Sequence, residues 1–490
     1  MNRPIRNIAV ACLVLFTALL LNANLVQFVQ ADSLNDRNGN KRVINEEFSR
    51  DRGAILVDGK PVAESVASDD EYKFQRRYPE GGLYAPLTGY FSYIYGRGAL
   101  ENSQNRVLSG SDDRLFVNRV VDLLSNKQPK GGSVELTIDP LAQKAASEGL
   151  ERLGDGTKGA VAAIDPKTGA VLAMVTNPSY NPNRLASHDF AAVQKSWESL
   201  TTDEDQPMTN RSTQQTLPPG STFKLITAAA ALENGVVDDI DDQVKAGSQL
   251  TFPGTSYTLP NEGGGNCGGN RITFERALNI SCNVTFGSLA LDIGQDKLAE
   301  QAAKFGFGTD PITGIAASPS RFTSGDAEME RTSLAQSGIG QFEVAATPLQ
   351  MAMVAAGIAN DGDVMTPYVV DTVRAPNLRV LDKTQPEQYS TAVSTDTARK
   401  LREMMVSTVE VGTATSAQIP GVEVGAKTGT AQSTEDRPPY AWFVSYAKDG
   451  DNEVAVAVLV ESSDTARPEI AGGRLAGPIA KSVMEAVLGK

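Results

Sequence analysis

The chain has 490 residues, of which 41% are hydrophobic and 21% are charged, and its formal net charge is −14. The length predicts two or three domains at about 150 residues each, and the composition is that of a globular protein with a full core. The acidic balance excludes nucleic acid as the main partner, because no basic surplus is available to neutralise phosphates. His188 is the only histidine, so a histidine metal cluster is excluded and a Ser-His-Asp triad would have to use that residue. A serine enzyme built on this chain is therefore expected to use lysine as its base.

An uncharged apolar stretch lies near the start of the chain. Residues 8–31 carry no charged side chain, and these 24 residues are enough for a helix that spans a bilayer. Arg3 and Arg6 precede the stretch, which places the N-terminus in the cytoplasm and the bulk of the chain outside. A cleaved signal peptide is the alternative, but the stretch is long for one and lacks a clean small-x-small cleavage site. We therefore predict a single-pass cell-membrane protein, with a short cytoplasmic tail and transmembrane anchor over residues 1–31.

The next region is polar and rich in turn residues. Asp58-Gly59 separates two short apolar runs, which predicts a β-hairpin. No cluster of catalytic residue types occurs here, so we predict a smaller strand-rich pedestal domain over residues 32–154, acting as a spacer or docking domain. The catalytic domain is then expected over residues 155–490. A helical pattern at 141–153 could belong to either side of this boundary.

The remaining residues predict a sheet covered by helices. Strand pairs around polar turns are expected at 160–175 and 441–461. Helical patterns occupy 221–234, 272–293, 347–361 and 475–488. Strands at both ends of the domain fit this arrangement better than a βαβ repeat. The expected fold class is therefore α/β of the α+β type, with a mainly antiparallel sheet covered by helices.

Ser221 and Lys224 stand at the start of the first of these helices. Pro218, Pro219 and Gly220 break the preceding structure, and positions i and i+3 share a helix face, so the hydroxyl and the amine can meet. One interpretation makes Ser221 an N-cap and Lys224 a solvated residue of the first turn, as in most Ser-x-x-Lys strings. The other makes Ser221 a nucleophile beside its own base, with the cap position and the nucleophile being the same residue.

Two further strings provide context for the second interpretation. Ser281-Cys-Asn283 interrupts the helical pattern at 272–293, and Lys427-Thr428-Gly429 precedes the C-terminal strand pair. Together with Ser-x-x-Lys, these strings form a set that occurs in penicillin-binding proteins and β-lactamases.

Each string alone is weak, because the chain contains further copies. Ser445 and Lys448 form a second Ser-x-x-Lys, but they fall in a predicted strand, where positions i and i+3 point to opposite faces. Lys167-Thr168-Gly169 is a second Lys-Thr-Gly, but it lies in a hairpin turn before any nucleophile. Only the first set combines a helix start, a helix break and a strand beside the C-terminal hairpin in a sensible order.

The chain resembles the class B penicillin-binding proteins. The strings PPGSTFK, SCN and AKTGTA look like the active-site motifs of that family, and the hairpin at 162–175 and the segment at 337–352 are similar too. The resemblance is strong over residues 160–490 and loose over residues 32–153, and no region of glycosyltransferase size precedes the pedestal, which argues against class A. It implies a serine transpeptidase/β-lactamase-like domain behind a dimerisation-like pedestal, without a metal or organic cofactor.

Chemistry gives the catalytic residues their expected roles. The Ser221 hydroxyl is a weak nucleophile that needs a neighbouring base. Lys224 can serve only when neutral, although a free lysine has a pKa of about 10.4, and burial and a second ammonium at Lys427 would lower that pKa. Lys427 is expected to stay charged, to attract a substrate carboxylate and to help a proton relay through Ser281. Asn283 is expected to hold Lys224 and a substrate amide by hydrogen bonds.

The resemblance also implies substrate-binding residues. The backbone N–H groups of Ser221 and Thr430 would form an oxyanion hole, in which one donor is worth roughly 10²–10³ in rate. The hydroxyls of Thr428 and Thr430 would bind the terminal carboxylate of the substrate. Gly429 would let the strand approach the acyl chain.

These residues predict a peptidoglycan D,D-transpeptidase of cell wall synthesis. Ser221 would attack the penultimate D-Ala carbonyl of a stem peptide, release terminal D-Ala and pass the acyl group to an amine of a neighbouring stem. β-Lactams would acylate the same serine, and the resemblance implies a polytopic glycosyltransferase as a partner. The rivals are a D,D-carboxypeptidase or β-lactamase with the same nucleophile and, in another class, a non-catalytic division scaffold or antibiotic sensor. A scaffold needs neither lysine, which disfavours it.

Cys267 and Cys282 are the two cysteines outside the predicted anchor. Disulfides persist outside the cytoplasm, and a bridge here would pin the glycine-rich loop at 261–270 to the middle residue of the Ser-x-Asn string. In the chain-entropy model, closing a loop of about 15 residues contributes about 3 kcal/mol. We predict the disulfide, with two free thiols as the alternative.

Overall fold

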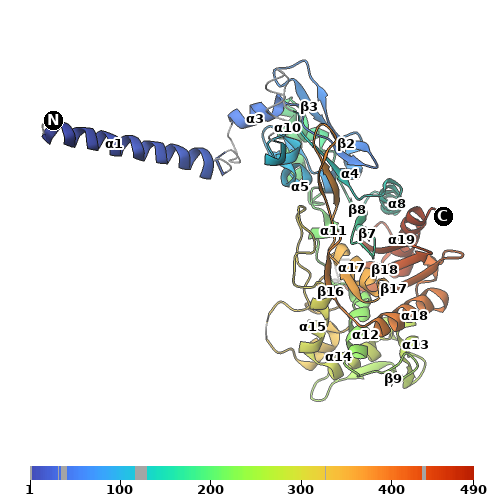
Figure 1. The fold of residues 1–490 in the computed structure, drawn as a ribbon. Coiled ribbons are helices and arrows are strands. Elements are labelled where there is room, and N and C mark those ends of the chain that lie inside the picture. The colour runs from blue at the N-terminus through green and yellow to red at the C-terminus, as the bar shows by residue number, and fades with distance from the viewer. Residues whose placement is uncertain (1–2, 31–32, 35–40, 116–129, 326, 433–437) are drawn as a thin grey trace.

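A single apolar helical element precedes the folded domains. The computed structural model describes residues 3–30, 33–34, 41–115, 130–325, 327–432 and 438–490 (Figure 1). Helix α1 (Arg3–Asn24) continues into the π-helical turn η1 (Leu25–Val29), and together they are long and apolar enough to cross a membrane. No residue of α1 is buried, and Figure 1 shows the helix extending away from the rest of the chain. The expected apolar helix is confirmed.

A six-stranded sheet organises the pedestal, in the order β15-β14-β6-β1-β2-β3. Its strands are β1 (Ile55–Val57), β2 (Lys60–Ala67), β3 (Phe74–Arg77), β6 (Ser133–Leu136), β14 (Val370–Arg374) and β15 (Val380–Lys383). The hairpin predicted around Asp58-Gly59 is confirmed, and both residues have positive φ angles, 49° and 68°, as a two-residue type I′ turn requires. The strands β14 and β15 were not expected here, because they come from the C-terminal part of the chain.

Short elements complete the pedestal and its upper surface. They are α3 (Lys41–Phe48), α4 (Gly81–Thr88), β4 (Phe91–Ser92), β5 (Gly96–Arg97), α5 (Ala99–Ser103), α6 (Asn105–Leu108), η2 (Asp113–Leu115), α9 (Asn183–Ala186) and α10 (Phe190–Thr201). Figure 1 shows α10 beside α3 and β3, although it follows the pedestal region by many residues in the chain.

A buried carboxylate joins several parts of the pedestal. Glu101 on α5 accepts hydrogen bonds from Arg52 Nε at 2.7 Å, Arg76 Nε at 2.6 Å and the Tyr78 hydroxyl at 3.1 Å. Burial alone would raise the pKa of Glu101, but the charges and hydrogen bonds of the two arginines outweigh it, and the pKa is lowered. Because the folded-state pKa is depressed, this stabilisation is present above the unfolded-state pKa and is lost as pH falls through the folded-state pKa.

Replacement of Glu101 by glutamine is expected to lower the free energy of unfolding by about 3 kcal/mol, because two buried guanidinium groups lose their counter-charge. Urea unfolding of the full chain in detergent measures this change. The control is Glu80→Gln, which alters an exposed carboxylate before α4 and should leave the unfolding curve unchanged. A loss below about 1 kcal/mol in Glu101→Gln, the size of a surface substitution, would contradict the expected role.

A five-stranded antiparallel sheet forms the centre of the C-terminal domain, in the order β17-β18-β19-β7-β8. Its strands are β7 (Lys158–Ile164), β8 (Val171–Asn177), β17 (Glu423–Ala431), β18 (Tyr440–Asp449) and β19 (Asn452–Ser462). Both predicted strand pairs are confirmed, and β19 pairs with β7, which joins the two ends of the domain. Strand β17 is at the sheet edge, so alternate backbone N–H groups on it face away from β18.

Helices cover both faces of this sheet because successive side chains alternate across each strand. Phe443 packs with α8 (Pro140–Glu151) and α19 (Gly472–Leu488) on one face, whereas Trp442 and Val444 belong to the core on the other face. That second face is covered by α17 (Pro348–Ala359) and α18 (Thr395–Val411), and α12 (Lys224–Glu233) packs against α18 and against α14 (Asn283–Ile293) in the same core. The expected mixed α/β fold with a helix-covered antiparallel sheet is confirmed.

The helical pattern at 272–293 is two helices, α13 (Phe274–Asn279) and α14, separated at the Ser-x-Asn string. Helix α8, which the sequence left open between the two domains, packs against α19 and β8. Smaller elements of this domain are α11 (Arg211–Gln214), β9 (Gln243–Lys245), β10 (Gln249–Thr251), β11 (Thr258–Pro260), η4 (Glu262–Gly264), β12 (Arg271–Thr273), α15 (Gln295–Lys304), α16 (Arg331–Ser337), β13 (Asp363–Met365) and β16 (Gln388–Thr391).

Candidate active site

Ser221 lies in the 3-10 turn η3 (Gly220–Phe223), which leads directly into α12. The turn packs against β17, and Gly220 takes a φ of 54°, which glycine adopts without steric cost. Ser221 is 7% exposed. The N-cap positions are Pro219 for the turn and Phe223 for the helix, so the expectation that the cap and the nucleophile are one residue is wrong. Ser221 nevertheless stays at the helix entrance.

Lys224 is the first residue of α12 and is fully buried. Its Nζ lies 2.8 Å from Ser281 O, 3.0 Å from Ser281 Oγ and 2.6 Å from Asn283 Oδ1. The alternative in which Lys224 is a solvated first-turn residue is therefore wrong. The two predicted strings, Ser-x-x-Lys and Ser-x-Asn, come together through this amine.

Ser281 connects the two lysines. Its Oγ lies 3.0 Å from Lys224 Nζ and 2.9 Å from Lys427 Nζ. The residue lies between α13 and α14 with a φ of 58°, a left-handed conformation that costs a non-glycine residue about 1 kcal/mol or more. Lys427 reaches it from β17 and also donates to Thr428 O at 2.8 Å. A proton could pass between the two amines through this hydroxyl.

Both lysines have a lowered pKa. Burial, and then the charge of Lys427, lower the pKa of Lys224 well below its ordinary value. Burial lowers the pKa of Lys427 to about 7, and the charge of Glu262 opposes both shifts. The charge of Lys427 thus favours the neutral form of Lys224, as expected. The lowered pKa of Lys427 was not part of the expectation, which assigned this residue a lasting positive charge.

The Lys-Thr-Gly-Thr residues occupy the edge of β17. The hydroxyl of Thr428 lies 2.7 Å from that of Thr413, and Thr430 lines the open space beside Ser221. A Cβ on Gly429 would come within 2.9 Å of Pro219 O, which real side chains do not tolerate. The glycine is therefore needed to pack β17 on the Ser221 turn, which differs from the expected contact with an acyl chain.

Two adjoining cavities open onto these residues. The first, of about 530 Å³, contains Ser221 and Asn283, and the second, of about 450 Å³, contains Ser281 and Thr428. The residues that line both are Asn261, Glu262 and Thr430. Asn261, Glu262 and Thr413 belong to no recognisable motif, so they were not predicted; the expected disulfide was the one signal that pointed toward the loop of Asn261 and Glu262.

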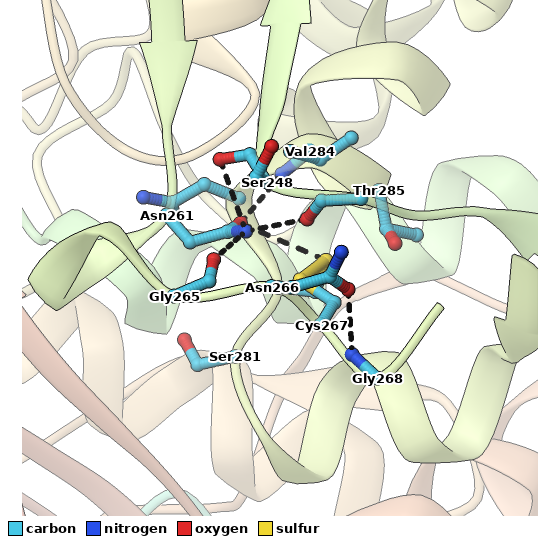
Figure 2. The surroundings of a disulfide bond; sticks show 12 residues. Ser248, Asn261, Gly265, Asn266, Cys267, Gly268, Ser281, Val284 and Thr285 are labelled. Atoms are coloured by element: carbon cyan, nitrogen blue, oxygen red, sulfur yellow. Dashed lines mark hydrogen bonds between the residues drawn. A yellow bond between two sulfur atoms is a disulfide. The ribbon is translucent and has the colours of Figure 1, made fainter. Parts of the chain in front are cut away.

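The disulfide between Cys267 and Cys282 is present, and Figure 2 shows Asn261 beside it. Asn261 Nδ2 donates to Gly247 O at 2.7 Å and to Gly265 O at 2.8 Å, while Val284 N donates to Asn261 Oδ1 at 3.2 Å. The side chain and the disulfide together fasten the glycine-rich loop to the start of α14. The loop therefore forms a fixed wall of the site.

Unfolding the unreduced chain in the presence of an alkylating agent is expected to modify Cys12 alone, because the other two thiols are joined. Replacing Cys267 and Cys282 together by serine is expected to lower the free energy of unfolding by about 3 kcal/mol. Intact mass and urea unfolding measure the two effects, with Cys12→Ser as the control. Alkylation of all three cysteines without reduction would contradict the disulfide.

The competing strings lie elsewhere. Ser445 donates to Val456 O from the middle of β18, and Lys448 pairs with Glu453 at the surface, so this Ser-x-x-Lys pair points in opposite directions, as predicted. His188 pairs with Asp70 of the pedestal and lines neither of the two cavities as the structure describes them.

Comparison with known proteins identifies the family. Residues 159–485 match the penicillin binding protein transpeptidase domain, and residues 52–134 match the penicillin binding protein A dimerisation domain. The chain belongs to the penicillin-binding protein transpeptidase family, and the resemblance indicated by the motifs is confirmed.

Some members of this family are similar to the chain over its full length. The chain is 42% identical to peptidoglycan D,D-transpeptidase PbpA of Mycolicibacterium smegmatis, over 100% of this chain and 99% of the relative. It is 40% identical to PbpA of Mycobacterium tuberculosis, with the same coverage. The solved penicillin G acyl-enzyme complex of penicillin-binding protein A from M. tuberculosis is similar over 90% of this chain and 100% of that chain, with a TM-score of 0.84 and 40% identity.

Proposed function

We propose that the chain is a peptidoglycan D,D-transpeptidase that works through an acyl-enzyme on Ser221 and is acylated by β-lactams. The observation that carries this proposal is the contact of both buried lysines with Ser281 Oγ, at 3.0 Å and 2.9 Å, beside a cavity that contains Ser221. A neutral amine one helical turn after a serine is the arrangement that activates a weak hydroxyl nucleophile.

In the first half-reaction, Ser221 Oγ attacks the penultimate D-Ala carbonyl of a stem peptide and its proton passes to neutral Lys224. The Ser221 turn and Thr430 of the edge strand β17 would supply backbone N–H groups to the developing oxyanion. The peptide C–N bond then breaks, and terminal D-Ala leaves after its nitrogen receives a proton through the chain Lys224, Ser281 and Lys427. Thr428, with Thr430, is proposed to hold the terminal carboxylate.

In the second half-reaction, an amine of a neighbouring stem attacks the ester carbonyl and regenerates Ser221. Asn283, whose Oδ1 already contacts Lys224, is proposed to orient that amine base and a substrate amide. The products are a cross-link and free enzyme, with no metal or organic cofactor in either step.

The proposed setting is the outer side of the cell membrane. The element α1–η1 would be the single anchor. Residues 32–154 without α8, joined by β14 and β15, would be the pedestal, and α8 with the rest of residues 155–490 the transpeptidase domain. The relatives named PbpA and the apolar N-terminal helix support this setting. A polytopic glycosyltransferase in the same membrane, which makes the strands to be cross-linked, is the proposed partner.

The experiment that tests the function uses the full chain in detergent with penicillin, followed by intact mass measurement. One added penicillin per chain is expected, with slow release. An unchanged mass would remove the acylation step. Supplying a stem-peptide donor with an amine then separates transfer from hydrolysis: a cross-linked product supports the transpeptidase, whereas D-Ala release with water as the sole acceptor indicates a carboxypeptidase.

A further inference from the structure

Transfer to an amine poses an electrostatic problem at this site. An alkyl amine has an ordinary pKa of about 10.4, so an acceptor arrives as an ammonium ion at neutral pH. The site that it must enter has Lys224 and Lys427 beneath it and Arg276 on the wall of the second cavity. A cation approaching these groups is repelled unless a negative charge lies on its path.

Glu262 is that negative charge. Among the described residues that line either cavity, it is the one carboxylate, and it lines both. Its side chain is exposed, and it forms no ion pair within the described part of the chain. Burial lowers the pKa of Lys224 and Lys427, and the charge of Glu262 opposes that shift in both, so its field reaches the catalytic amines.

The backbone that carries Glu262 is fixed to the catalytic strings. Asn283 Nδ2 donates to Pro260 O at 3.0 Å on one side of it. On the same side, Val284 N donates to Asn261 Oδ1, and on the other side Gly265 O accepts from Asn261 Nδ2 (Figure 2), with the disulfide at Cys267 two residues further on. The carboxylate is therefore carried at a defined place over the cavity that contains Ser221.

We propose that Glu262 determines the acceptor specificity of the transpeptidase: it binds the ammonium group of an aliphatic primary amine carried on a peptide, at the mouth of the Ser221 cavity. This inference rests on the proposed function. The same cavity is lined by Gln336, Gln341 and Gln432, whose amides can donate to and accept from the peptide groups that flank the amine.

The transfer step balances as follows. The ammonium bound by Glu262 loses one proton to solvent, and the free amine nitrogen forms a bond with the ester carbonyl carbon. The bond between that carbon and Ser221 Oγ breaks, and a second proton of the nitrogen passes through Lys224 to Ser221 Oγ. Glu262 acts on the approach of the cation and forms no covalent bond in this step.

The test compares two nucleophiles on one acyl-enzyme. The full chain in detergent is acylated with an acyl-D-alanyl thioester, and the products of hydrolysis and aminolysis are quantified with Nα-acetyl-lysine amide, which carries one ammonium, or with hydroxylamine, which is uncharged at neutral pH. Glu262→Gln is expected to reduce the partition to the lysine derivative about tenfold and to leave the partition to hydroxylamine unchanged. Glu262→Asp should restore most of the loss, and added salt should weaken the wild-type preference for the cation.

Glu410→Gln is the matched control, because it removes an exposed carboxylate from α18 without touching the cavities. An unchanged partition in Glu262→Gln, or an equal loss with both nucleophiles, would overturn the inference. Failure of the wild-type chain to form any acyl-enzyme would instead count against the proposed function itself.

Discussion

Replacement of Ser221 by alanine is expected to abolish labelling by penicillin and all transfer of acyl groups, because the chain then lacks the oxygen that forms the ester. The substitution removes one small hydroxyl from a turn whose shape is set by its packing on β17. Its effect on the free energy of unfolding is therefore expected to stay below about 1 kcal/mol. Intact mass after penicillin treatment and urea unfolding measure the two quantities on the same sample.

The chain offers a matched control for this experiment in its second Ser-x-x-Lys string. Ser445→Ala removes a buried hydroxyl that donates to Val456 O, and it should retain full labelling. Labelling that persists in Ser221→Ala would place the nucleophile elsewhere. Full support of growth by Ser221→Ala in a cell that depends on this protein would favour a scaffold or sensor over an enzyme.

Replacement of Lys224 by methionine is expected to slow acylation by penicillin about 10³-fold, within the range for loss of a positioned general base. Methionine keeps an unbranched side chain of similar length in a fully buried position, and the atoms that accept hydrogen bonds from Lys224 are uncharged, so the substitution leaves no opposite charge unpaired among them. Lys448→Met is the control, since Lys448 lies at the surface and pairs with Glu453. Acylation within tenfold of wild type would rule out Lys224 as the base.

The pH profile gives the same prediction a second readout. The second-order rate of acylation reports the free enzyme. It should fall on the acid side as Lys224 gains a proton, at a pH well below 10.5, because burial and the charge of Lys427 lower its pKa. It should fall again on the alkaline side as Lys427, with a pKa of about 7, loses the charge that attracts the penicillin carboxylate. Lys224→Met should lose the acid limb, and a profile unchanged in shape would contradict the assignment.

Local patterns made the catalytic sheet predictable. The turns at Asp165 and Lys448 are polar and flanked by apolar runs, so both strand pairs could be placed before their partners were known. The strands β14 and β15 are different, because they are short and partly polar, and β14 joins the pedestal sheet by pairing with β6, more than 200 positions earlier in the chain. Nothing within a local window of sequence encodes such a pairing.

The residues of the site also fall into two groups, those that the local sequence indicates and those that only the structure shows. Lys224 and Lys427 belong to strings whose spacing has a chemical meaning, so their meeting at Ser281 was expected. Glu262 could be assigned to the site only from the cavities in the structure, because a single glutamate in a glycine-rich loop belongs to no sequence motif. The lowered pKa of Lys427 also required the structure, since it depends on complete burial.

Because the chain returns to the pedestal through β14 and β15, the pedestal and the transpeptidase domain are mechanically coupled. Strand β6 pairs with β1 on one side and with β14 on the other, so a pedestal cut away after residue 154 would expose the backbone edge of β6 to other chains. The chain passes between the pedestal and the transpeptidase domain at three places: near residue 154, before β14 and after β15. Bending at one of these connections therefore cannot rotate the transpeptidase domain freely. Displacement of the pedestal, by a partner or by the membrane, would therefore be transmitted to the catalytic domain through covalent backbone at three places. Exchange of pedestals between relatives would need the segment at 370–383 to travel with the N-terminal strands.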